Sequence, residues 1–167
     1  WARASQPANI DVIGIGNDLG ANEYIASLNG LAVNTNWMKY YIPIPDPSKL
    51  TQERGMLYFA EGPENGRGYT FWIDDVVFEK LGTVVPVSSG IFNGEDQVQT
   101  VETGAVFSAD GFATFNLPSG IDQRVAAAPS YFDFTSSNPT VANVDMSGQV
   151  TVLDEGEAVI TASLGGE

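Results

Sequence analysis

The sequence contains no cysteine and no histidine, and it has few positive charges. Of its 167 residues only 7 are Lys or Arg, against 21 Asp or Glu, which gives a net charge of −14. Without His and Cys, the chain lacks the residues for histidine-based catalytic triads, thiol nucleophiles and His-ligated zinc sites. Because so acidic a surface repels phosphate groups, neither nucleic acid nor an anionic membrane surface is an expected partner.

Long apolar runs are missing as well, and none approaches the ~18 residues of a membrane-spanning helix. We therefore expect no membrane insertion, while the lack of cysteine leaves export from a bacterium open. The chain begins without Met, inside the apparent strand WARAS (residues 1–5), so we expect it to be a fragment of a longer protein.

Aromatic residues, glycine and proline are abundant, with 9 Phe, 6 Tyr, 3 Trp, 18 Gly and 9 Pro. Aromatic and β-branched residues that are separated by Gly, Pro, Asn and Asp favour an all-β fold. The stretch NIDVIGIGNDLG (residues 9–20) is similar to the glycine-rich opening of a dinucleotide-binding fold, but Leu19 stands where that fingerprint needs a small residue. We interpret this stretch as a strand that ends in a turn.

The composition changes near residue 82. Residues 1–82 carry 6 basic and 10 acidic side chains (net −4), whereas residues 83–167 carry 1 and 11 (net −10) and fewer aromatic residues. We therefore predict a first domain over 1–82, a linker or first edge strand over 83–90, and a second domain over 91–167.

Five strands are expected in the first domain, at residues 10–15, 23–28, 37–44, 55–61 and 69–79. Alternation in the last three gives each strand one aliphatic or Phe-rich face and a second face with one large aromatic residue, namely Tyr41, Tyr58 and Trp72. That second face is either ordinary core under another layer, or a platform on which sugar rings stack. The nearby loop EGPENGRGY contains Glu61, Asn65 and Arg67, which are either turn residues or hydrogen-bonding partners for sugar hydroxyls.

The second domain is predicted to consist of short strands at 97–101, 105–108, 112–116, 131–136, 141–145, 149–153 and 157–163. Hairpin signals occur at Asp110-Gly111, Ser147-Gly148 and Glu155-Gly156. Regularly spaced short strands of this kind indicate an Ig-type β-sandwich.

Three elements follow one another within residues 131–163: SSNPTVANVD, SGQVTVL and GEAVITA. In this order and at this spacing they resemble the bacterial Ig-like domain of group 2. The segment 84–130 resembles that family only loosely.

The blocks WARAS, NTNWMKYYIPIP and YTFWIDDVVFEKLG in residues 1–82 resemble the C-terminal half of a jelly-roll, galactose-binding-like carbohydrate-binding module. The resemblance implies glycan binding on a sheet, within a secreted multidomain protein that acts on polysaccharides. It also implies a structural Ca²⁺ ion held by Asp74 or Asp75, and the alternative is that these residues only close a strand at the surface.

A carboxylate pair of the glycosidase kind is the remaining catalytic option. Asp74 and Asp75 do not form one, because adjacent strand residues point to opposite faces. Glu61 and Asp74 could face each other as such a pair only if their strands pair suitably. The sequence thus predicts a non-catalytic fragment: a partial jelly-roll β-sandwich that binds polysaccharide or oligosaccharide, followed by an Ig-like β-sandwich as spacer, outside a bacterial cell and joined to other domains of the same parent protein. The alternative is a purely structural or adhesive array.

Overall fold

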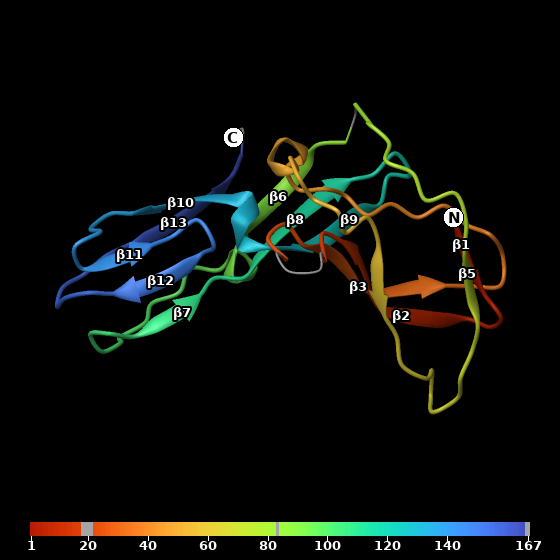
Figure 1. Ribbon diagram of the computed structural model, residues 1–167, viewed down its shortest axis with the longest axis horizontal. Helices are drawn as coiled ribbons and strands as arrows, with labels where there is room; N and C mark the ends of the chain where they lie inside the picture. The colour runs from red at the N-terminus through yellow and green to blue at the C-terminus, as the bar shows by residue number, and fades with distance from the viewer. Residues whose placement is uncertain (18–21, 83, 166–167) are drawn as a thin grey trace.

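A computed structural model describes residues 1–17, 22–82 and 84–165. The chain is almost entirely β in these ranges, with several sheets in a sandwich-like arrangement, so the predicted all-β fold class is confirmed (Figure 1). The strands are β1 Ala2–Ala4, β2 Ala8–Ile15, β3 Ala26–Val33, β4 Tyr58–Ala60, β5 Phe71–Ile73, β6 Pro86–Ile91, β7 Val106–Ser108, β8 Gly111–Asn116, β9 Asp122–Ala127, β10 Phe132–Ser136, β11 Ala142–Val144, β12 Gln149–Val152 and β13 Ile160–Leu164. Short 3-10 turns lie at η1 Pro47–Lys49, η2 Phe92–Gly94 and η3 Pro129–Tyr131. In the described ranges we find no helix with the length and apolarity to cross a bilayer.

A six-stranded antiparallel sheet occupies the centre of the molecule, in the order β4-β2-β3-β9-β8-β6. β3 pairs with β9 through Ala26 and Ala127, so this sheet takes strands from both sides of residues 83–90. Within that segment, β6 begins at Pro86 and forms one edge of the sheet, where a residue without a backbone N–H is tolerated. The division of the chain into two domains stays a prediction.

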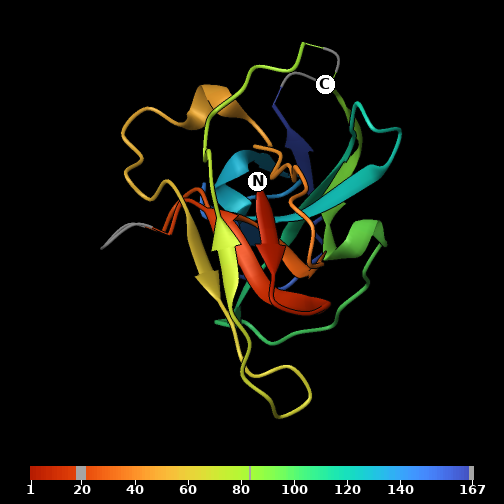
Figure 2. The same ribbon diagram turned by 90° about the vertical axis from the view of Figure 1, so that its right-hand side faces the viewer.

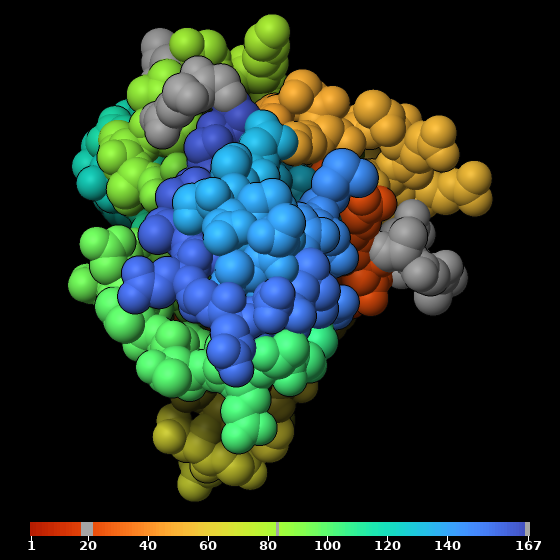
Figure 3. All heavy atoms as spheres, turned by 90° about the vertical axis from the view of Figure 1, so that its left-hand side faces the viewer, coloured from red at the N-terminus to blue at the C-terminus, as the bar shows by residue number. Residues whose placement is uncertain are grey.

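Smaller sheets lie at the two ends of the central sheet. β1 and β5 form an antiparallel pair at one end, and β10-β13 and β11-β12-β7 lie at the other (Figure 1). Figure 3 views the second end, where residues of β10–β13 (blue) are flanked by the green segment that contains β7. This second end is the region with the predicted Ig-like strands.

One apolar core runs through these layers. It includes the fully buried side chains of Ile10, Val125 and Tyr131, which come from distant parts of the sequence. β1 contributes the small buried side chains of Ala2 and Ala4 to the same core. Burying one large aliphatic or aromatic side chain stabilises the fold by roughly 1.5–3 kcal/mol, so this shared core holds the sheets together.

The glycine-rich stretch near residue 14 is a strand, as predicted, while most of the predicted turn after it falls outside the described residues. β2 ends at Ile15, and Gly16 follows with a φ of 81°, a left-handed conformation that glycine adopts without strain. Residues 22–25, where the described chain resumes, form no helix. Leu19 itself falls outside the described residues.

Several predicted strands differ from the observed ones. Residues 37–44 form only an isolated bridge, at Met38, because the sequence IPIP contains two prolines that cannot donate to a ladder. The predicted strand 97–101 does not form, and Val98 within it is 98 % exposed. The strand β9, by contrast, was not expected. Strand 69–79 shortens to β5, and its continuation leaves Val77 and Phe78 exposed.

Of the three expected hairpins, one is confirmed. Ser147-Gly148 joins β11 to β12, which pair antiparallel from Ala142↔Val152 to Val144↔Val150. Asp110-Gly111 and Glu155-Gly156 are wrong as hairpins, because the strands on either side of each turn belong to different sheets. These two turns carry the chain from one layer to another.

Candidate functional site

The two-stranded sheet of β1 and β5 carries an exposed aromatic surface. Arg3 pairs with Trp72 in the register of the two strands. On the other edge of β1, Ala2 exchanges two backbone hydrogen bonds with Met38, of 2.9 and 3.0 Å. β1 is thus held between β5 and the segment around Met38, and Figure 2 views this end of the molecule.

Alternation along β1 separates core from surface. Ala2 and Ala4 are buried in the core, so Trp1 and Arg3 lie on the outer face. In β5, Phe71 packs partly against the core and Trp72 lies on the outer face, opposite Arg3. The small alanines allow β1 to lie close to the core, while its outer face presents large side chains.

The guanidinium group of Arg3 lies over two indole rings. Its Cζ atom is 4.5 Å from the ring centroid of Trp72 and 5.3 Å from that of Trp37. Trp72 is 40 % exposed, Trp37 42 % and Trp1 46 %. We call Trp1, Arg3, Trp37 and Trp72 the indole surface. Cation–π contacts of this kind stabilise by roughly 0.5–2 kcal/mol and fix the orientation of both partners.

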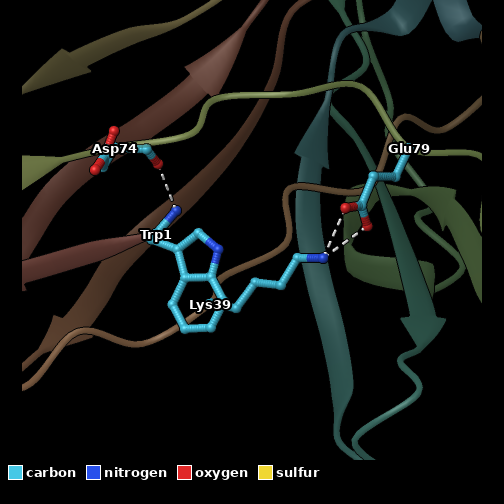
Figure 4. Close-up of polar contacts among 4 residues, drawn as sticks. All are labelled: Trp1, Lys39, Asp74 and Glu79. Atoms are coloured by element: carbon cyan, nitrogen blue, oxygen red, sulfur yellow. Dashed lines mark hydrogen bonds and ion pairs between the residues drawn. The ribbon is translucent and has the colours of Figure 1, made fainter.

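Backbone and ion-pair contacts fix the rim of the indole surface (Figure 4). The backbone nitrogen of Trp1 donates to the carbonyl oxygen of Asp74 at 2.9 Å, which extends the β1–β5 ladder. Lys39 forms an ion pair with Glu79 at 2.7 Å, and its Nζ lies 5.0 Å from the ring centroid of Tyr41. The Glu79 carboxylate raises the pKa of Lys39, because it stabilises the ammonium form.

The three aromatic residues that the sequence grouped together do not lie on one sheet. Trp72 is on the β1–β5 pair, and Tyr41 is half-buried in the segment that follows Met38. Tyr58 belongs to β4 and pairs with Gly14 of β2 in the central sheet. Its ring packs over Gly14, since a Cβ added there would lie 2.8 Å from Tyr58 Cε1. The expected sharing of one face by Tyr41, Tyr58 and Trp72 is therefore wrong, because the strands separate into two sheets.

Two carboxylates that follow β4 accept hydrogen bonds from the backbone of β2. The backbone N–H of Asp11 donates to Glu61 Oε2 at 2.8 Å, and that of Asn9 donates to Glu64 Oε2 at 3.1 Å. The two carboxylates thus accept hydrogen bonds from the edge of β2 beyond the residues that pair with β4. Burial, with the neighbouring Glu61 carboxylate, raises the pKa of the Tyr69 hydroxyl.

Asn65 and Arg67 lie in the tight turn of the same loop. Glu64 and Arg67 form an isolated bridge, and the two residues between them have positive φ angles, 49° for Asn65 and 75° for Gly66. Positive φ at both central positions defines a type I′ turn, for which Asn-Gly is the preferred pair. Turn chemistry thus accounts for Asn65, while a role for Glu61, Asn65 and Arg67 toward a glycan stays a prediction.

Asp74 and Asp75 are both exposed, directly after β5. The backbone N–H of Asp75 donates to Asp74 Oδ1 at 2.9 Å, and Asp75 has a φ of 49°, so the regular strand ends here. Among the residues that the structure describes, no group of three or more Asp, Glu, His or Cys is arranged to hold a metal ion. The calcium site at Asp74 or Asp75 stays a prediction.

The sequence predicts Trp72 as a ligand-binding residue, but it does not predict Arg3 or Trp37 as part of the site. The alternation of WARAS, with small residues at 2 and 4 and large ones at 1 and 3, was a signal for Arg3. The contact of Trp37 with Arg3 had no local signal, because it depends on a pairing between segments that are 36 residues apart.

The comparisons with known proteins concern the other end of the chain. No curated protein and no solved structure matches the sequence. Nothing found in them bears out the resemblance of residues 1–82 to a carbohydrate-binding jelly roll, which stays a prediction. One family model does match, described as the intimin immunoglobulin-like domain, over residues 127–166. That region is therefore similar to a bacterial Ig-like domain of the intimin type, and the Ig-like character predicted for this part of the chain is confirmed.

Proposed function

We propose that this chain is a non-catalytic, glycan-binding part of a bacterial surface protein, which binds polysaccharide through the indole surface and uses the Ig-like region as a spacer. The observation that carries the proposal is the row Trp37, Arg3 and Trp72, in which the exposed rings are held in place by the cation between them. A fully buried Trp72 would have removed this possibility.

Exposed indoles suit a sugar ligand for physical reasons. The apolar C–H face of a pyranose ring covers the indole plane, while polar groups beside the ring bond to hydroxyls. Stacking needs a ring that is already fixed, since ordering a mobile side chain upon binding costs roughly 0.5–1.5 kcal/mol. The contacts of Arg3 with both rings reduce that cost.

The Ig-like region supports the placement on a cell surface. Intimin, whose immunoglobulin-like domain gives the matching family model its description, is a bacterial surface protein. In this proposal the strands β10–β13 keep the indole surface at a distance from the cell, and they take no part in the binding of the glycan.

A second candidate function is a purely structural or adhesive module without a glycan site. The family match over residues 127–166 favours it, since such a domain acts as a spacer or an adhesive unit. In that case the contacts of Arg3 with Trp37 and Trp72 serve only to hold β1 against its two neighbours.

Affinity electrophoresis against a panel of plant, algal and fungal polysaccharides separates the two functions. We expect retardation of the wild-type chain by at least one polysaccharide, and loss of most of it in Trp72→Ala and in Trp37→Ala. Met146→Ala is the control, because Met146 is 85 % exposed at the opposite end of the molecule. Thermal unfolding of each variant checks that it remains folded. If no polysaccharide retards the wild type, the glycan function is wrong and the spacer function is favoured.

A further inference from the structure

We propose that the indole surface selects acidic polysaccharides, and that Arg3 binds the carboxylate or sulfate group of the sugar. This inference rests on the proposed function and adds a ligand class to it. Its starting point is the state of Arg3, a cation held on an exposed surface without an acidic partner.

Arg3 differs from the two lysines that form ion pairs. Lys39 is paired with Glu79 and Lys49 with Asp133. In the described ranges, 1–17, 22–82 and 84–165, Arg3 has no carboxylate within 4.0 Å and no hydrogen-bond partner, and its Nε atom is buried and unbonded. Other cations of the described ranges also lack an ion pair, so what sets Arg3 apart is its place over two exposed indole rings.

The Nε–H of Arg3 is buried, but its Nη1 and Nη2 groups are not and donate to no protein atom in the described ranges, so these groups are available to a ligand. A guanidinium group that stacks on aromatic rings uses its two faces, while its five N–H donors lie in the plane at its edge. These donors match the two oxygens of a carboxylate or a sulfate in a bidentate arrangement. Because Trp37 and Trp72 fix the position of the group, a sugar that stacks on either ring brings its acidic substituent close to Arg3.

The net charge of −14 does not oppose this selection at physiological salt. The Debye length there is about 8 Å, so carboxylates at the far end of the molecule are screened. At the rim, Glu79 is paired with Lys39, and the exposed Asp74 and Asp75 remain as the repulsion that the contact with Arg3 must outweigh. An acidic polymer that binds to so acidic a chain must find a particular cation, whereas a basic protein attracts polyanions without one. The binding of an acidic glycan should therefore depend on one residue.

Pairs of polysaccharides that differ only in charge test the inference. The carboxylate arm compares de-esterified with fully methyl-esterified homogalacturonan, and the sulfate arm compares dextran sulfate with dextran. We expect the acidic member of at least one pair to bind about tenfold more tightly than its neutral partner, which is the size of effect that one charge-assisted contact gives.

Substitution of Arg3 tests whether it is the residue that binds the acidic group of the sugar. Arg3→Gln should abolish the preference for the acidic member, so that both members of each pair bind equally. Both should also bind less tightly than they do to the wild type, because the two indole rings lose the cation that holds them in place. Arg3→Lys should retain part of the preference, since it keeps the charge but not the bidentate geometry. Arg124→Gln is the matched control, because Arg124 also lies over an aromatic ring, that of Phe112, but sits on β9.

The outcomes separate the two proposals. If the wild type binds both members of each pair equally, the acidic selection is overturned while the glycan function stands. The same conclusion follows if Arg3→Gln keeps the wild-type preference for the acidic member. If Arg3→Gln does not fold, the wild-type comparison and Arg3→Lys still decide. Failure of the wild type to bind any glycan, acidic or neutral, overturns both proposals.

Discussion

The hydroxyl of Tyr131 donates a hydrogen bond of 2.8 Å to the backbone carbonyl oxygen of Tyr24, and the two rings meet edge to face with centroids 5.4 Å apart. Tyr131 is fully buried and belongs to the region that matches the Ig-like family, whereas Tyr24 precedes β3 of the central sheet. The contact therefore connects the Ig-like region with the N-terminal strands, and it should contribute to the stability of both.

Tyr131→Phe should lower the free energy of unfolding by about 1–2 kcal/mol, because the carbonyl of Tyr24 loses a buried partner while the ring packing remains. Urea denaturation at neutral pH measures this change. Tyr41→Phe is the control, since Tyr41 is half-buried in the segment that follows Met38 and takes no part in the contact with Tyr24. A cost for Tyr131→Phe no larger than that of the control would contradict the role assigned to the hydrogen bond.

The same tyrosine predicts how stability changes in alkali. Burial, followed by the carboxylates of Glu53 and Asp46, raises the pKa of Tyr131 above its ordinary value of 10.0. The folded chain thus holds the proton more strongly than the unfolded chain, so this stability is fully present below pH 10 and is lost as the pH rises beyond it. Urea denaturation at pH 9 to about 12 should show a shallower loss for Tyr131→Phe than for the wild type. Burial also raises the pKa of Tyr69, which should account for part of the loss that remains.

Gly14 holds three strands close together, so Gly14→Ala should destabilise the central sheet. An added Cβ would collide with the carbonyl oxygen of Ala26 and lie 2.8 Å from both Ser27 Cβ and Tyr58 Cε1. Overpacking of this kind costs roughly 1–3 kcal/mol, which urea denaturation detects. Gly68→Ala is the matched control, because nothing lies within 4 Å of a Cβ added there. Equal stability of the two variants would show that the strands separate without cost.

The fold class and the core faces of several strands were predictable because they follow from local alternation. In β5 the sequence FWI placed Phe71 and Ile73 inward and Trp72 outward, and the structure has them so. In β4 the same alternation puts Phe59 on the inner face with Leu57, and this is wrong for Phe59: it is 52 % exposed, and it packs edge to face on Phe71 at 5.1 Å instead of entering the core. Alternation identifies a face but not the layer that covers it.

Long-range pairings could not be predicted. β9 was missed because Ala126 and Ala127 have low strand propensity, although Val125 beside them is fully buried. The indole surface depends on such a pairing too, since it needs the segment at Met38 to lie beside β1. Periodicity within one segment carries no information about which distant segment pairs with it.

Asp145 stabilises the turn between β11 and β12, and this predicts a sensitivity to acid. It accepts hydrogen bonds from the hydroxyl of Ser147 and from the backbone N–H groups of Ser147 and Gln149, and these bonds lower its pKa below its ordinary value of 3.8. A lowered pKa in the folded chain gives stability that is present above pH 3.8 and is lost as the pH falls through the folded value.

Asp145→Ala should therefore lower the free energy of unfolding by about 1 kcal/mol at neutral pH, a modest cost because the carboxylate is exposed to water. Urea denaturation at pH 7 and near pH 3 measures the difference between variant and wild type, and this difference should shrink at the lower pH. Asp154→Ala serves as the comparison, because Asp154 accepts a single bond, from the N–H of Glu155. A difference that is the same at both pH values would contradict the assignment to the ionised carboxylate.

Substitution of Glu61 tests whether this residue stabilises the fold or contacts the glycan. Its carboxylate accepts the backbone N–H of Asp11 beyond the end of β4, so Glu61→Ala should lower the free energy of unfolding by about 1 kcal/mol, with Glu157→Ala, an exposed position, as the control. Affinity electrophoresis of the same variants tests the role toward a glycan. If Glu61 acts only on the edge of β2, retardation by a polysaccharide should equal that of the wild type once the variant is folded. Weaker retardation without a loss of stability would instead place Glu61 in contact with the sugar, and the binding surface would then extend from Trp72 to the loop after β4.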